Sequence, residues 1–84
     1  MLTTKKYLEV HGIKPSLQRM AVMDYLFKHR THPTAEEIFN ALYPSIPTLS
    51  RTTVYNTLKL LVEQGAALGL DIDDKQIHYD GDTS

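Results

Sequence analysis

The 84-residue chain contains no cysteine, and this absence excludes several classes of protein at once. Without a thiol the chain cannot form a disulfide scaffold, a thiol nucleophile or a thiolate zinc site. No stretch approaches the 18 consecutive apolar residues of a membrane-spanning helix, and the first twenty residues lack a signal-peptide pattern. We therefore expect a soluble, cytoplasmic protein with no membrane partner, and 84 residues allow only one domain.

Sequence motifs of enzymes are also missing. The chain has no glycine-rich phosphate loop, no nucleophile elbow and no convincing acid–base pair. Ser16 and Ser50 are better explained as helix caps than as nucleophiles. We therefore predict that the protein is not an enzyme and takes no small-molecule substrate.

The net charge of −1 conceals an uneven distribution of charge along the chain. Residues 1–60 carry eight basic and four acidic side chains, a balance of +4. Residues 61–84 carry one basic side chain, Lys75, and six acidic ones, a balance of −5. A polyanion would therefore bind the first part of the chain and not the last.

Capping residues and apolar spacing predict three helices in the first half. Thr3 or Thr4 caps a short helix that Gly12 ends, and Ser16 caps a second helix reaching about Arg30. Thr34 and Glu37 form a capping box at the start of a third helix, which Pro44 stops. The predicted buried positions are Leu17, Met20, Met23, Leu26 and Phe27 in the second helix and Ala35, Ile38, Phe39 and Leu42 in the third.

A proline-containing connector, which leaves room for one short strand near Ile46, leads into a fourth helix over residues 50–64. Ser50 is its predicted N-cap, Leu49 packs on Val54, and Gly65 ends it. Alternation of Leu68, Leu70 and Ile72 with polar or small residues then predicts a strand, residues 73–76 a turn, and residues 77–79 a second strand. The predicted fold is mainly α with a small β-hairpin, in the order of a winged helix-turn-helix.

The helix over residues 50–64 begins with poor helix formers, which calls for an explanation. On a helical wheel Val54, Leu58, Leu61 and Val62 gather on one side, and Thr52, Asn56, Lys59 and Glu63 on the other. The later turns therefore anchor the helix. Its exposed start displays Ser50, Arg51, Thr52, Thr53, Tyr55 and Asn56.

These side chains suit the major groove of DNA. Hydroxyls and free N–H groups at a helix start bind phosphates, and asparagine pairs with an adenine edge. Arginine binds guanine or phosphate, and a tyrosine ring packs on a thymine methyl. The alternative is structural, because Ser and Thr are ordinary caps and Tyr55 could be a half-buried core residue.

Three motifs in order along the chain resemble the N-terminal, DNA-binding half of the ferric uptake regulator family of bacterial metal-dependent repressors. They are Gly12-Ile13-Lys14-Pro15-Ser16-Leu17-Gln18-Arg19, His32-Pro33-Thr34-Ala35-Glu36-Glu37-Ile38 and Thr53-Val54-Tyr55-Asn56-Thr57-Leu58, with Leu61-Val62-Glu63-Gln64-Gly65 as a further match. The second and third motifs are most similar to the peroxide-sensing branch.

The resemblance implies a role for each matching residue. Lys14 corresponds to a basic residue that enters the minor groove, Tyr55 to a tyrosine that packs on thymines, and Asn56 to a neighbouring base-contacting position. Arg19, Ser50, Arg51, Thr52 and Thr53 would hold phosphates or orient the helix, and Lys59 completes the expected DNA-binding set. The implied partner is an A·T-rich palindromic operator in double-stranded DNA, bound by a homodimer of the full-length protein.

The resemblance also implies metals. His32 and Asp80 correspond to two ligands of a regulatory Fe²⁺ or Mn²⁺ site, and imidazole and carboxylate groups suit both ions. The remaining ligands, the cysteine pairs of a structural Zn²⁺ site and the dimerisation domain of the family are absent from residues 1–84. We therefore expect a fragment of a longer protein that holds no metal tightly, because its two ligands would be brought together only with a second domain. Within this fragment, His32 is equally well read as a polar residue before a helix cap.

A second function of a different class stays open. The acidic end of the chain and the net charge near zero also fit a winged-helix module that binds protein and not DNA. Salt-dependent binding to duplex DNA would distinguish the two.

Overall fold

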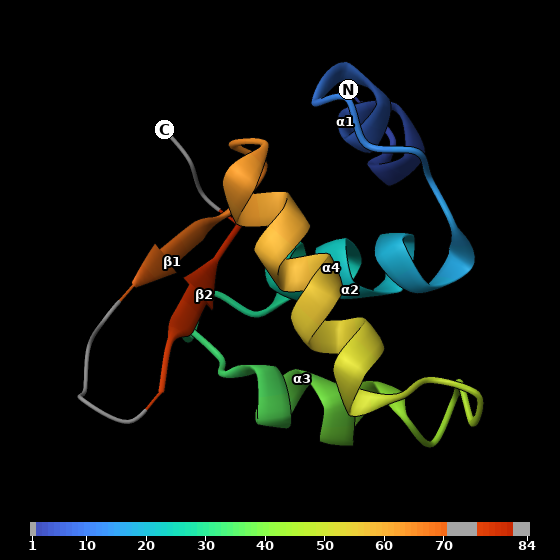
Figure 1. Ribbon diagram of the computed structural model, residues 1–84, viewed down its shortest axis with the longest axis vertical. Helices are drawn as coiled ribbons and strands as arrows, with labels where there is room; N and C mark the ends of the chain where they lie inside the picture. Colours follow the sequence, from blue (N-terminus) through green and yellow to red (C-terminus); the bar gives the residue numbers. More distant parts are fainter. Residues whose placement is uncertain (1, 71–75, 82–84) are drawn as a thin grey trace.

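Four helices are followed by a two-stranded antiparallel hairpin (Figure 1). The computed structural model describes residues 2–70 and 76–81. The elements are α1 (Thr4–Val10), α2 (Leu17–Lys28), α3 (Ala35–Leu42), α4 (Arg51–Glu63), β1 (Leu68–Leu70) and β2 (His78–Asp80). In the hairpin Leu68 pairs with Asp80 and Leu70 with His78. The predicted class, mainly α with a small hairpin, is confirmed.

Each helix begins at a polar side chain that the sequence predicts as its cap. The hydroxyl groups of Thr3, Ser16, Thr34 and Ser50 each accept a hydrogen bond from the backbone N–H three residues further along. The Glu37 carboxylate also accepts from the Thr34 backbone N–H at 3.0 Å, which completes the capping box. The choice between Thr3 and Thr4 is thereby resolved in favour of Thr3.

The core is built from all four helices and closed by the hairpin. In Figure 1 α4 crosses in front of α2, with α3 below and the hairpin at the side. Leu8, Leu26, Ile38 and Leu58 are fully buried, one from each helix, and Tyr79 of β2 is 7% exposed. Since α4 packs on α2, α3 and β1, its inward face is fixed by three neighbours.

Two predicted core residues are exposed. Leu17 is 70% exposed because it is the first residue of α2 and lies beside the cap, before the helix meets its neighbours; Val22 is buried in that helix instead. Val62 is 37% exposed because it lies at the edge of α4, next to the hairpin. Met20, Phe27 and Leu42 are only partly buried.

Some predicted boundaries also differ. The connector after α3 forms turns and not a strand, because the Ile46 backbone N–H donates to the Leu42 carbonyl at 3.0 Å. α2 ends at Lys28, two residues before the predicted end, and β2 begins one residue later than predicted. Ile72 and most of the predicted turn over 73–76 lie outside the described residues.

The loop between α2 and α3 is joined to the hairpin. The Tyr79 backbone N–H donates to the Pro33 carbonyl at 2.9 Å, and Thr34 forms a bridge with His78. His32, just before, has a φ of 58°, a left-handed conformation that non-glycine residues rarely adopt. Within the two described ranges, no helix is long and apolar enough to cross a membrane.

Candidate nucleic-acid interface

The outward face of α4 carries most of the predicted DNA-binding residues. Val54, Leu58 and Leu61 are fully buried and anchor the helix on the core. The opposite face is open to solvent: Tyr55 is 52% exposed, and Ser50, Thr52, Asn56 and Lys59 are exposed as well. Thr53 is half-buried, and its hydroxyl lies 2.9 Å from that of Ser50. The interpretation of Tyr55 as a core residue is therefore wrong.

The Tyr55 ring borders an apolar groove between α4 and the hairpin. The groove has a volume of about 360 Å³, and Tyr55, Val62, Ile77 and Tyr79 contribute its apolar lining. Tyr79 forms the buried side of the groove, and burial raises the pKa of its phenol, with the nearby Tyr55 as a second cause. The phenol of Tyr79 therefore stays neutral near neutral pH.

Arg51, the first residue of α4, points back toward α3. Its Nε donates to both carboxylate oxygens of Glu36 at 3.0 Å, and its Nη2 lies 3.0 Å from Oε1. Its guanidinium carbon stands 4.6 Å above the centre of the Phe39 ring, a cation–π contact. The pairing lowers the pKa of Glu36 and raises that of Arg51, mainly through the side-chain hydrogen bond. This partner was not predicted from the sequence. The resemblance implies that Arg51 holds a phosphate or orients the helix, and the contacts with Glu36 and Phe39 join the start of α4 to α3.

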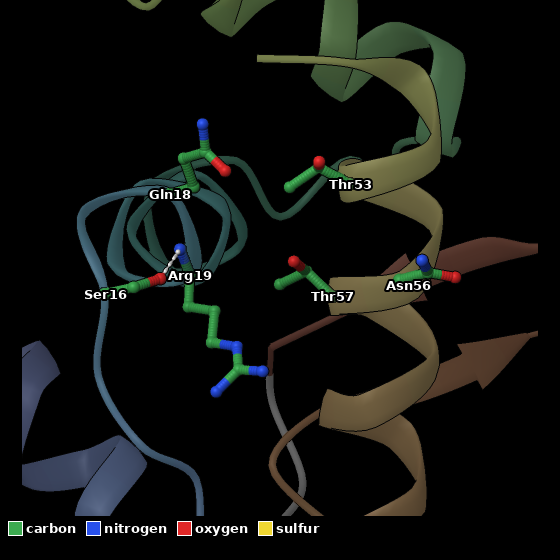
Figure 2. A pocket seen from close by; sticks show the side chains of 6 residues that line it. All are labelled: Ser16, Gln18, Arg19, Thr53, Asn56 and Thr57. Carbon is green, nitrogen blue, oxygen red and sulfur yellow. Dashed lines mark hydrogen bonds between the residues drawn. The ribbon is translucent and has the colours of Figure 1, made fainter. Parts of the chain in front are cut away.

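The start of α2 lies beside α4. The Arg19 Nη1 donates to the Lys14 carbonyl at 2.8 Å, which holds the exposed loop carrying Lys14 against α2. Between the two helices is an open, polar groove of about 340 Å³, shown in Figure 2. Its lining residues are Ser16, Gln18, Arg19, Thr53, Asn56 and Thr57. Gln18 and Thr57 were missed by the sequence analysis, although the i, i+4 spacing of Thr53 and Thr57 puts both on one face of α4.

The two predicted metal ligands lie side by side, so the expectation that only a second domain brings them together is wrong. His32 Nε2 is 3.3 Å from Asp80 Oδ2, although 48 positions separate the two residues in the sequence. Their side chains are 42% and 17% exposed, and His78 Nδ1 is 2.7 Å from the His32 carbonyl oxygen. Among the described residues no group of three or more His, Cys, Asp or Glu side chains could hold a metal ion. Four of the six acidic side chains after residue 60, Asp71, Asp73, Asp74 and Asp82, lie outside the described residues.

Residues 10–84 match the model of the ferric uptake regulator family. The chain belongs to this family. It is 39% identical over 72 residues to the peroxide-responsive repressor PerR of Staphylococcus aureus strain Mu50, an alignment that covers 86% of the chain and 49% of the relative. The resemblance stated from the motifs, including the one to the peroxide-sensing branch, is therefore confirmed.

Solved structures of the ferric uptake regulator family have the same fold. The structure described as the basis for peroxide sensing and gene regulation by PerR from Streptococcus pyogenes superposes with a TM-score of 0.82 at 33% identity, covering 95% of this chain and 58% of that one. A manganese uptake regulator superposes with a TM-score of 0.85 at 25% identity, covering 95% and 59%. The chain spans about half the length of the curated relatives it matches.

Proposed function

We propose that residues 1–84 form the winged-helix DNA-binding domain of a metal-dependent transcriptional repressor of the peroxide-responsive type. The supporting observation is that α4 is anchored by three fully buried residues and exposes Tyr55 and Asn56 on the opposite side. A helix of that kind enters the major groove and reads bases with its N-terminal residues. The relatives named above are repressors or regulators, which accords with a protein that is not an enzyme.

Under this proposal the site residues divide into two groups. Tyr55 packs on thymine methyls and Asn56 contacts an adenine edge, so these two read an A·T-rich sequence. The others position the domain on the sugar–phosphate backbone: Ser50, Thr52 and Thr53 at the start of α4, Lys59 further along it, and Arg19 at the start of α2. Lys14 enters the adjacent minor groove from its exposed loop.

Of the two roles expected for Arg51, holding a phosphate or orienting the helix, we propose the second. Its guanidinium is engaged by Glu36 and Phe39, so it fixes the start of α4 on α3 and offsets a carboxylate that would repel DNA. Arg51 is thus a positioning residue, and not a phosphate ligand.

Three variants test the role of Arg51. Arg51→Gln leaves Glu36 uncompensated and should weaken duplex binding, whereas Glu36→Gln removes a negative charge and releases Arg51, and should strengthen it. The double variant Glu36→Gln/Arg51→Gln should bind as the unaltered chain does, measured by fluorescence anisotropy at low salt. A double variant that binds much more weakly, with a salt slope reduced by about one, would instead mean that Arg51 contacts a phosphate.

The operator partner implies a second copy of the protein. A palindromic site presents two half-sites to a symmetric dimer, and one domain engages only one of them. We propose that a C-terminal domain outside residues 1–84 supplies the dimer contacts in the full-length protein. The isolated domain then binds weakly, because the contacts of the second half-site are lost.

A titration with duplex DNA tests the proposed function directly. The unaltered chain is titrated with an A·T-rich palindromic duplex and with a scrambled duplex of equal length and composition, at low and at moderate salt. We expect binding to weaken as salt rises, because phosphate contacts release counterions, and the palindrome to be preferred. Binding that responds to neither salt nor sequence would reject the proposal.

The apolar groove between α4 and the hairpin favours a second candidate function. Its lining by Tyr55, Val62, Ile77 and Tyr79 would suit an apolar side chain of a protein partner. A winged-helix module that binds protein is therefore the alternative. Duplex binding that responds to neither salt nor sequence would support it.

His32 and Asp80 fit a regulatory metal. Their nitrogen and oxygen donors lie 3.3 Å apart, and imidazole with carboxylate is a donor set for Fe²⁺ or Mn²⁺. Such an ion, when bound, would draw together ligands from two domains. We propose that the missing ligands, and a structural Zn²⁺ site with its cysteines, belong to the rest of the full-length protein.

Because only two ligands, His32 and Asp80, are present, we expect residues 1–84 to bind Mn²⁺ weakly and at one place. Paramagnetic line broadening in NMR spectra should centre on His32 and Asp80 and should not saturate at stoichiometric metal. His32→Ala should abolish it. His29→Ala is the matched control, because His29 is exposed and stacks on Tyr25. Broadening that persists in His32→Ala would refute the assignment.

A further inference from the structure

The polar groove between α2 and α4 contains a buried side chain without a hydrogen-bond partner. Thr57 is 5% exposed, and its hydroxyl makes no hydrogen bond with any residue of the described ranges. No polar side-chain atom sealed inside the described part of the protein lacks a partner. The Thr57 hydroxyl must therefore reach the groove, and Figure 2 shows Thr53 and Thr57 pointing from α4 toward α2.

The opposite wall of this groove is the first turn of α2. Ser16 caps the helix by accepting from the Arg19 backbone N–H at 3.2 Å, so the N–H groups of Leu17 and Gln18 have no partner within the helix. The twelve-residue α2 adds the positive end of its dipole at this point. Arg19 brings a full positive charge, and its bond to the Lys14 carbonyl uses only one of its five N–H groups.

Donors therefore dominate the groove. A hydroxyl, a guanidinium and the start of a helix converge on it, and none of its lining residues is acidic. This combination selects an anion with several oxygen acceptors, which is the chemistry of a phosphate group.

We propose that this groove seats one backbone phosphate of the bound DNA strand, with Thr57 as its buried donor and Arg19 as its charge. The proposal rests on the proposed function and deepens it. Asn56 lines this groove and also the apolar groove on the other side of α4, so the seat adjoins the base-reading face. With α4 in the major groove of the duplex, the start of α2 beside it would face the backbone of one DNA strand.

Thr57→Val tests the seat, because valine has the same shape as threonine and lacks the hydroxyl. The loss should be about tenfold in duplex affinity, the effect of removing one hydrogen bond to a charged group. It should be equal for the A·T-rich palindrome and the scrambled duplex, because a phosphate carries no sequence information. Thr57→Ser keeps the hydroxyl and should retain most of the affinity. Neither change should lower the melting temperature by more than a few degrees, since no internal hydrogen bond is lost.

Neutral methylphosphonate linkages, placed one at a time along the duplex, locate the phosphate. At one linkage on each half-site, the neutral group should weaken binding of the unaltered chain but have little further effect on Thr57→Val. Two outcomes would overturn the proposed phosphate site but leave the proposed function standing. One is that the losses of affinity from Thr57→Val and from the neutral linkage add at every linkage. The other is that Thr57→Val binds as tightly as the unaltered chain. Absence of salt-dependent binding by the unaltered chain would instead reject the proposed function, and the seat with it.

Discussion

Tyr55→Ala should weaken binding to the A·T-rich operator duplex by about 1–3 kcal/mol and relax the preference at one thymine position. The ring is 52% exposed and is held at the edge of α4 between the open face and the groove in front of Tyr79. Under the proposed function, removing the ring takes away the contact to a thymine methyl, while the buried residues that anchor the helix stay in place. Anisotropy titrations against a set of duplexes with single substitutions measure both effects.

Tyr55→Phe is the matched control for the alanine variant. Phenylalanine keeps the ring and loses only the hydroxyl, so most of the affinity and the thymine preference should remain. Circular dichroism melting should give the same midpoint for all three proteins within a few degrees, because an exposed side chain contributes little to stability. If Tyr55→Ala and Asn56→Ala both bound the operator as tightly as the unaltered chain, the reading face would lie elsewhere.

Leu58→Ala should lower the free energy of unfolding by about 2–5 kcal/mol, a large share of the stability of a domain this small. Leu58 is fully buried where α4 meets the rest of the core, and the deletion leaves a cavity that the neighbours fill only in part. DNA binding should fall in parallel, because part of the population would be unfolded. Urea unfolding followed by circular dichroism measures the change.

Val62→Ala tests the same helix at its exposed edge. Its side chain is 37% exposed, so we expect a change within about 0.5 kcal/mol. The contrast with Leu58 checks the rotation of α4 about its axis, on which the exposure of Tyr55 and Asn56 depends. Equal destabilisation by the two substitutions would mean that the helix is turned differently.

The sequence predicted the features of this fold that depend on neighbouring residues. A capping hydroxyl acts on an N–H three positions away, so Ser16, Thr34 and Ser50 could be identified from spacing alone. Burial depends on which elements a helix packs against, and the apolar pattern does not show this. It could not show that Leu17 precedes the packed part of α2, or that Val62 lies at the edge of the buried face of α4.

In the candidate site, too, features set by nearby residues could be predicted, and features set by the packing of distant elements could not. Exposure of Asn56 and Tyr55 followed from the apolar stripe on the other side of α4, so these positions were predictable. The engagement of Arg51 by Glu36 was not, because it depends on the angle between two helices. The closeness of His32 and Asp80 within this domain was not expected, since the resemblance named both as ligands but no local pattern connects residues 48 positions apart.

The short strand β2 joins the His32–Asp80 pair to the apolar groove beside Tyr55. Asp80 faces His32, while the ring of its immediate neighbour Tyr79 lines the groove that holds Tyr55. The Tyr79 backbone is at the same time tied to Pro33, beside His32. Under the proposed function, a ligand that displaced Asp80 would act one peptide bond away from Tyr79, which lines the same groove as Tyr55.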